Sequence, residues 1–150
     1  MGKPVIADGQ ALITWQMPCV QATFYQPEDN PYFAISATDG RGTLYGLDYE
    51  SVRPHLIEII CSERNAIRGN HVHQHCTEMF TVMSGEISMF LLCMCPGKHL
   101  LEKVMVAGMT VRIAAGTPHA VFARTKGESV AAYSDGDPRH DRDRVILLEY

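Results

Sequence analysis

The segment that decides the fold is RGNHVHQHCTEMF, residues 68–80, closed by the turn Ser84-Gly85-Glu86. In a β-strand the side chains alternate between two faces, so His71 and His73 point the same way, about 7 Å apart. Glu78 opens a second apolar run, and the glycine turn lets this run fold back as a hairpin. The pattern therefore predicts a carboxylate beside two imidazoles.

A fourth candidate ligand lies downstream in GMTVRIAAGTPH, residues 108–119. Residues 111–113 alternate as a strand, residues 115–118 read as a turn, and His119 opens the next strand. Three imidazoles and one carboxylate form a coherent ligand set for one divalent transition metal per chain, with positions left for water or substrate. Iron, zinc, manganese, nickel and copper all accept such ligands. The predicted metal ligands are His71, His73, Glu78 and His119.

The spacing of these residues resembles the two motifs of the cupin family. His71-x-His73, four residues, Glu78, six residues and Gly85 resemble the first motif. Gly108, five residues, Ala114-x-Gly116, two residues and His119 resemble the second. The chain departs from the usual pattern at three positions, none of which is a proposed ligand: Asn65 and Ala114 replace a glycine and a proline, and Ala123 replaces an asparagine.

The resemblance implies an all-β fold, a double-stranded β-helix or jelly-roll barrel. The residue pattern agrees, because short strands about ten residues apart, broken by glycine turns, are typical of an antiparallel sandwich or barrel. We expect a single domain over residues 1–150, with residues 1–31 as an N-terminal arm. Residues 134–150 are expected to form a charged loop, either a solvated surface loop or a lid, followed by a C-terminal strand at 145–150.

Composition excludes several classes of protein. The formal net charge of −4 over 150 residues leaves no basic footprint for a nucleic acid. The longest apolar runs fall short of the ~20 residues of a membrane helix, and the N-terminus has no apolar core of a signal peptide, so a cytoplasmic protein is expected. Five cysteines without a CxxC pair indicate reduced thiols. Cys76, inside the ligand segment, is an alternative ligand or redox partner, although its strand parity disfavours this role, and His75 is another alternative ligand.

Polar residues near these motifs indicate how a small-molecule substrate could be held. Arg68 precedes the first histidine and is expected to bind an anionic group, unless it is an ordinary surface arginine. Tyr45 and Tyr133 are the candidate proton-transfer residues. The Arg-Gly-Asn-His-x-His segment is similar to cupins of nucleotide-sugar metabolism, which implies an isomerase or epimerase that uses its metal to polarise a carbonyl. In metal-free relatives the histidine at the position of His71 is a proton-transfer base.

Two other functions remain open. Three histidines and a glutamate also resemble the sites of cupin dioxygenases that hold iron, nickel, manganese or copper, and a non-catalytic small-molecule-binding cupin is the third possibility. The resemblance further implies a homodimer.

Overall fold

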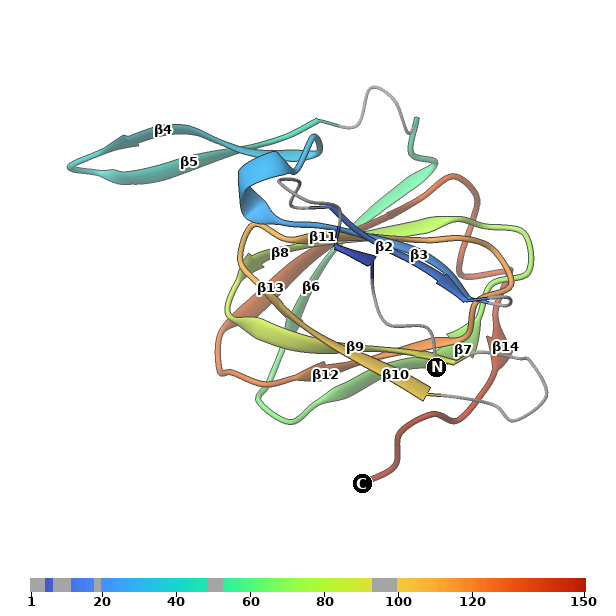
Figure 1. Ribbon diagram of the computed structural model, residues 1–150. Helices are drawn as coiled ribbons and strands as arrows, with labels where there is room; N and C mark the ends of the chain where they lie inside the picture. Colours follow the sequence, from blue (N-terminus) through green and yellow to red (C-terminus); the bar gives the residue numbers. More distant parts are fainter. Residues whose placement is uncertain (1–4, 7–11, 18–19, 49–52, 93–99) are drawn as a thin grey trace.

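The computed structural model is an antiparallel β-structure in two layers (Figure 1). It describes residues 5–6, 12–17, 20–48, 53–92 and 100–150. The Pro96-Gly97 pair, for which the sequence predicts a turn, lies outside these ranges, as do His99 and three of the five cysteines, Cys19, Cys93 and Cys95. The elements are β1 (Val5–Ile6), β2 (Leu12–Met17), β3 (Val20–Tyr25), the 3-10 helix η1 (Pro27–Asp29), β4 (Phe33–Asp39), β5 (Gly42–Leu47), β6 (Leu56–Ser62), β7 (Ile67–Val72), β8 (Glu78–Ser84), β9 (Glu86–Leu92), β10 (Leu100–Val106), β11 (Thr110–Ile113), β12 (His119–Ala123), β13 (Glu128–Ser134) and β14 (Asp143–Arg144).

The strands form two facing sheets and a separate hairpin. One sheet has the order β1-β2-β3-β11-β8-β13-β6, the other has the order β10-β9-β12-β7-β14, and β4 pairs with β5 alone. Figure 1 shows the β4–β5 hairpin extending away from the two layers. The predicted all-β jelly roll is therefore confirmed. The described residues include no helix with the length and apolarity needed to cross a membrane.

The hydrophobic core fills the space between the two sheets. The side chains that the contributing strands point between the sheets are buried, as expected for strands of two sheets packed face to face. The core residues come from six strands and one loop, and they include Phe24, Val82, Ile87, Met89, Leu91, Met105, Met109, Val111 and Ile113. Three of these are methionines, which fill irregular gaps in a core.

The N-terminal arm supplies a strand that the sequence interpretation missed. Residues 20–25 form β3, which pairs with β11 through Phe24 and Val111. The polar residues Gln21 and Thr23 separate its apolar residues and weaken the strand signal in the sequence, but Ala22 and Phe24 alternate onto the buried face. The arm is further held by Asn30, whose amide donates to the Gly108 carbonyl at 2.8 Å. Part of the predicted arm is therefore a strand of the larger sheet.

The expected C-terminal strand at 145–150 is wrong. Only Asp143 and Arg144 pair with β7, and the chain then leaves the ladder. The physical reason is Asn70, whose side-chain oxygen accepts hydrogen bonds from the Leu147 and Leu148 amides at 2.9 and 3.0 Å. A side chain has taken the place of the neighbouring strand's backbone, so the tail curves around Asn70 instead of extending the sheet.

Two turns place the ligand strands. Gly85, at φ 76°, joins β8 to β9, and a Cβ there would come within 2.5 Å of the Thr125 hydroxyl, so glycine is required. Asn65, at the position where the cupin pattern has a glycine, adopts φ 69°. Asparagine tolerates this left-handed conformation better than most residues, which explains why the departure from the motif leaves the fold intact.

Candidate metal centre

A β-bulge at the end of β7 brings two of the predicted ligands face to face. His71 is opposite His119 in the β7–β12 pair, whereas Ala120 is opposite Gly69, so Asn70 is the extra residue. Gly69 and Asn70 both have positive φ, at 82° and 57°. A Cβ on Gly69 would lie 3.0 Å from the His119 carbonyl oxygen, so the close approach of β12 requires glycine. The backbone of the Arg68-Gly69-Asn70-His71 segment thus sets the position of the His71 imidazole opposite His119.

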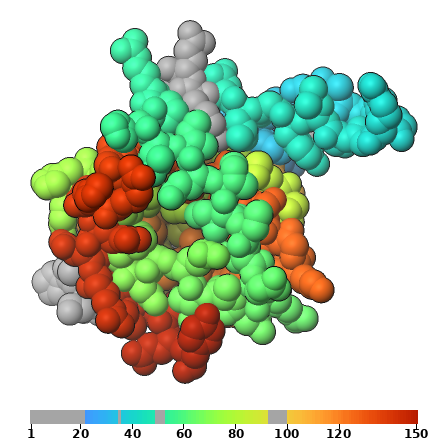
Figure 2. Space-filling view, turned by 180° about the vertical axis from the view of Figure 1, so that it is seen from behind, coloured from blue at the N-terminus to red at the C-terminus, as the bar shows by residue number. Residues whose placement is uncertain are grey.

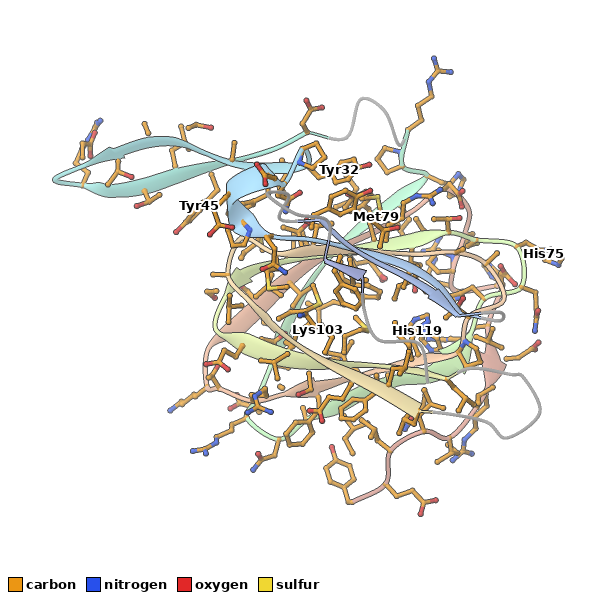
Figure 3. The ribbon with its side chains drawn as sticks, viewed as in Figure 1. Tyr32, Tyr45, His75, Met79, Lys103 and His119 are labelled. Atoms are coloured by element: carbon orange, nitrogen blue, oxygen red, sulfur yellow. The ribbon has the colours of Figure 1, made fainter. Side chains whose placement is uncertain are left out.

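The four predicted ligands converge. His73 lies just beyond β7, and Glu78 begins β8, where it is opposite Ile113 and Ser134. The potential ligand atoms of all four residues lie within 4.8 Å of one another. A metal bonded to nitrogen and oxygen at about 2.0–2.2 Å would hold its ligands at most about 4.4 Å apart, so shifts of a few tenths of an ångström close the site. Figure 3 shows His119 between the two layers.

The donor atoms are the kind that a metal satisfies. Oε2 of Glu78 lies 3.1 Å from Nε2 of His73 and 3.0 Å from Nε2 of His119. These contacts lack hydrogen-bond geometry, and the three atoms are buried without a hydrogen-bond partner. Because native proteins rarely bury polar atoms unsatisfied, their orphaned lone pairs indicate a missing shared partner. The chemistry of the donor set therefore fits a divalent transition metal.

Backbone carbonyls orient two of the imidazoles. Nδ1 of His119 donates to the Thr117 carbonyl at 3.0 Å, and Nδ1 of His73 donates to the carbonyl of Asp141. A carbonyl can only accept, so the proton sits on Nδ1 and the lone pair of Nε2 faces the cluster. Such contacts fix both the tautomer and the ring angle of metal-bound histidines.

The pKa values of Glu78 and His71 favour the protonation states that bind a cation. Burial by itself raises the pKa of Glu78, but the neighbouring His119 and His73 outweigh burial and bring this pKa down to about 2. Burial, followed by the nearby His119 and His73, lowers the pKa of His71 to about 4. Burial lowers the pKa of His73, but Glu78 and then Asp141 raise it above its usual value. At neutral pH the cluster presents a carboxylate and a neutral His71, both of which are competent ligands.

The two alternative ligands do not join the cluster. His75 is exposed, and Figure 3 shows it at the edge of the molecule, away from His119. Cys76 is buried and free, but it is not part of the group whose ligand atoms converge. Its amide and that of His75 both donate to the Asp141 carboxylate at 2.8 Å. These two residues therefore belong to the loop that carries the ligands.

A cavity of about 540 Å³ opens beside the cluster, between β6 and β7. Figure 2 shows this side of the molecule, where the surface is hollowed between the green β6–β7 segment and the red C-terminal segment. His71, Glu78 and His119 line the cavity, so a bound metal would be accessible from it. Arg68, the predicted substrate-binding residue, also lines it, and its guanidinium crosses from β7 to β6 to donate to the Ser62 hydroxyl at 2.7 Å.

The two predicted catalytic tyrosines do not reach this cavity. Tyr45 is on the projecting hairpin, 47% exposed, with its ring stacked on Phe33. Tyr133 is buried, but it alternates with Ala132, which lines the cavity, so its side chain lies on the other face of the sheet. Among the described residues, no tyrosine lines the cavity.

Sequence reasoning missed several polar residues of the site. Glu58, Glu128 and Arg142 line the cavity, and Asp141 holds the ligand loop. Glu128 had a detectable signal, because it alternates with Val130 and Ala132 and so faces inward on the same strand. Asp141 and Arg142 carry no such signal in the sequence, because they lie in the mixed-charge segment that follows residue 134. The lid interpretation of that run is the one that these contacts support.

The protein is a jelly-roll barrel with an internal polar site, because its two antiparallel sheets enclose a cluster of three histidines and one glutamate. The sequence model of the cupin family, described simply as cupin, matches residues 56–144, and the chain belongs to this family. A search of curated proteins found no matching relative.

Solved structures with the same fold include two epimerases and a ketoisomerase. They are ChmJ, a 3'-monoepimerase from Streptomyces bikiniensis in complex with dTDP-quinovose (17% identity, TM-score 0.67, covering 86% of this chain and 72% of that one), the dTDP-6-deoxy-D-glucose-3,5-epimerase RmlC from Legionella pneumophila (17%, 0.65, 91% and 78%), and a 3,4-ketoisomerase from Helicobacter canadensis (16%, 0.59, 75% and 90%). At such identities the likeness shows a shared fold.

Proposed function

We propose that this protein is a metal-dependent cupin enzyme that isomerises or epimerises a small carbonyl-bearing sugar. The observation that carries the proposal is the convergence of four ligand atoms within 4.8 Å, three of them from residues that line a cavity of about 540 Å³. A cavity of this size matches a small-molecule substrate. The sugar-modifying neighbours of similar fold support a sugar as the substrate class, and a nucleotide-linked sugar as its form.

The residues would divide the work as follows. His71, His73, Glu78 and His119 would hold the metal, which when bound supplies a Lewis acid for a carbonyl oxygen and for the charge that develops when the adjacent carbon loses its proton. Arg68 keeps guanidinium donors beyond those bonded to Ser62 and Cys61, and these would bind the anionic part of the substrate.

Proton transfer is assigned to Glu58 in place of the two tyrosines. Glu58 lines the cavity, and its cross-strand partner on β13 is Ala132. Glu78 has Ser134 as its partner on the same strand, two residues from Ala132. Two residues of strand correspond to about 7 Å, so a metal-bound sugar carbonyl and its neighbouring carbon fit between the ligand level and this carboxylate. A carboxylate is a common base for a proton next to a polarised carbonyl.

Metal content tests the first half of the proposal. Protein purified without a chelating tag should hold near one equivalent of a transition metal by elemental analysis, and His73→Ala and Glu78→Ala should lose it. His75→Ala is the matched control, because this histidine is in the same loop but exposed, and it should keep the metal. If wild-type protein binds no metal even on titration, His71 beside Arg68 becomes the leading proton-transfer pair of a metal-free isomerase.

Proton exchange tests the second half. The loaded enzyme incubated in D₂O with dTDP-4-keto-6-deoxyglucose should incorporate deuterium next to the keto group, as seen by NMR, and Glu58→Gln should slow this by 10²–10⁴-fold. The dioxygenase alternative is separated in the same samples, because it requires oxygen uptake and a redox-active metal whereas isomerisation requires neither. Oxygen uptake without exchange would overturn the isomerase proposal.

A further inference from the structure

The same cavity has a second polar end, away from the metal ligands. Glu128 begins β13 and is only 2% exposed, yet it lines the cavity. It is six residues along β13 from Ser134, the partner of Glu78, which corresponds to about 20 Å of strand. This separation places Glu128 outside reach of a reaction at the metal centre, so it is a recognition group rather than a base.

One oxygen of Glu128 is left without a partner. Oε2 is buried with no hydrogen-bond partner, whereas Ser62, opposite Glu128 in the β6–β13 pair, hydrogen-bonds the carboxyl group. Burial raises the pKa of Glu128 although Ser62 and the charge of Arg68 both lower it. A buried carboxyl oxygen that lines a cavity and lacks a partner costs free energy unless a ligand supplies one.

Arg68 completes a donor and acceptor pair at this end. Its Nε donates to the Ser62 hydroxyl at 2.7 Å and its Nη2 donates to the Cys61 carbonyl at 3.3 Å, which fixes the guanidinium over the seam between β7 and β6. Ser62 therefore contacts both Arg68 and Glu128. An acceptor and a cationic donor held side by side complement adjacent hydroxyl groups, each of which both donates and accepts. An ammonium group would meet Arg68, and Glu128 would repel an anionic group placed between the two residues, so the anionic part of a ligand is left to the remaining guanidinium donors of Arg68.

We propose that Glu128 and Arg68 form a second recognition site in the cavity, specific for a hydroxyl-bearing part of the ligand that lies beyond the ring whose carbonyl is at the metal, such as adjacent hydroxyls of a further sugar unit. Val130 and Ala132, which alternate with Glu128 on the same strand, form the apolar wall between this site and the metal centre. The site deepens the proposed function. The identification of the hydroxyl-bearing group as part of a sugar rests on that function. The site itself requires neither a metal nor a reaction.

Carbon-13 NMR of protein labelled at the glutamate carboxyl carbon tests this site directly. The Glu128 resonance is assigned by its disappearance in Glu128→Gln, or in Glu128→Asp if the first variant does not fold. Three probes are titrated: dTDP-glucose, dTDP alone, and D-glucose. The expected result is a saturable shift of the Glu128 resonance with dTDP-glucose and with D-glucose, and a markedly smaller shift with dTDP. Calorimetry should then show dTDP-glucose binding 10–100-fold weaker to Glu128→Gln, the loss of one hydrogen bond to a charged group.

The outcomes separate this inference from the proposed function. A Glu128 resonance unmoved by both sugar-bearing probes overturns the second site, even if the enzyme holds metal and exchanges protons. A shift with dTDP as large as that with dTDP-glucose also overturns it, because the group recognised would then be the nucleotide. A shift with D-glucose in protein that holds no metal supports the second site while the metal-dependent function fails. Glu102→Gln, on an outer strand, is the matched control and should leave binding unchanged.

Discussion

The backbone carbonyl of Asp141 accepts the Nδ1 proton of His73, while the carboxylate of the same residue binds the loop that follows His73. That carboxylate accepts from the amides of Gln74, His75 and Cys76 at 2.9, 2.8 and 2.8 Å. Burial raises the pKa of Asp141, but these amides and the Cys76 thiol outweigh burial and bring this pKa down to about 2. One residue of the C-terminal segment therefore fixes both a candidate ligand ring and the chain that leads from it to Glu78.

Replacing Asp141 should weaken metal binding although it is not a ligand. Asp141→Ala removes the acceptor of three amides, so the carbonyl that orients His73 loses its fixed position. We expect metal affinity to fall 10–100-fold, the usual effect of losing a contact that orients a ligand. The measurement is competition with a chromophoric chelator. Asp143→Ala is the control, because Asp143 makes a single 3.2 Å contact with the Gln74 side chain, and it should retain full affinity. Equal affinities for the two variants would refute the role of Asp141.

The metal-free protein should lose stability between pH 6.5 and pH 4 because of His71. Its pKa in the folded state is about 4, below the value of about 6.5 in the unfolded chain. Within this window the unfolded chain binds more protons, so the free energy of unfolding falls as the pH falls. With allowance for the half-exposed position of His71, we expect a loss of about 1–3 kcal/mol.

Denaturant unfolding in the presence of EDTA measures this slope. His71→Asn, which cannot titrate, should flatten it across the window. His73 does not interfere, because its pKa is raised: its contribution is complete below pH 6.5 and is lost only as the pH rises through its folded value. An unchanged slope in His71→Asn would assign the pH dependence to other groups.

The candidate ligand cluster was predictable from the sequence, whereas the groups around it were not. Motif spacing predicts His71, His73, Glu78 and His119, because strand alternation and hairpin turns convert the spacing of residues in the sequence into positions in the fold. The contacts of Asp141 and Asn70 join residues more than 60 positions apart, and no local pattern encodes them. Tyr133 was misplaced for a related reason: its face depends on β13 register, which only the neighbouring strands fix.

Asn70 should hold the C-terminal tail to the barrel. Besides accepting from the Leu147 and Leu148 amides, its side-chain amide donates to the Leu148 carbonyl at 2.9 Å. Asn70→Gly tolerates the positive φ of 57° but removes these three bonds, so hydrogen exchange at the two leucine amides should accelerate. Asn70→Asp retains the acceptor oxygen and should retain most of the protection. Full protection in the glycine variant would show that other contacts hold the tail.

The two described cysteines should differ sharply in reactivity. Cys61 is exposed, whereas Cys76 is 4% exposed, and burial, assisted by Asp141 and other nearby carboxylates, raises the pKa of the Cys76 thiol to about 12. Because the thiolate is the reactive species, iodoacetamide at pH 8 should label Cys61 at least 10-fold faster than Cys76 in native protein, measured by peptide mass spectrometry. In guanidinium chloride the two rates should converge. Asp141→Ala should accelerate labelling of Cys76, because it opens the loop and removes the carboxylate that contacts the thiol. Equal rates in the native state would mean that the loop between His73 and Glu78 is open in solution, and the preorganised metal site would then be wrong as well.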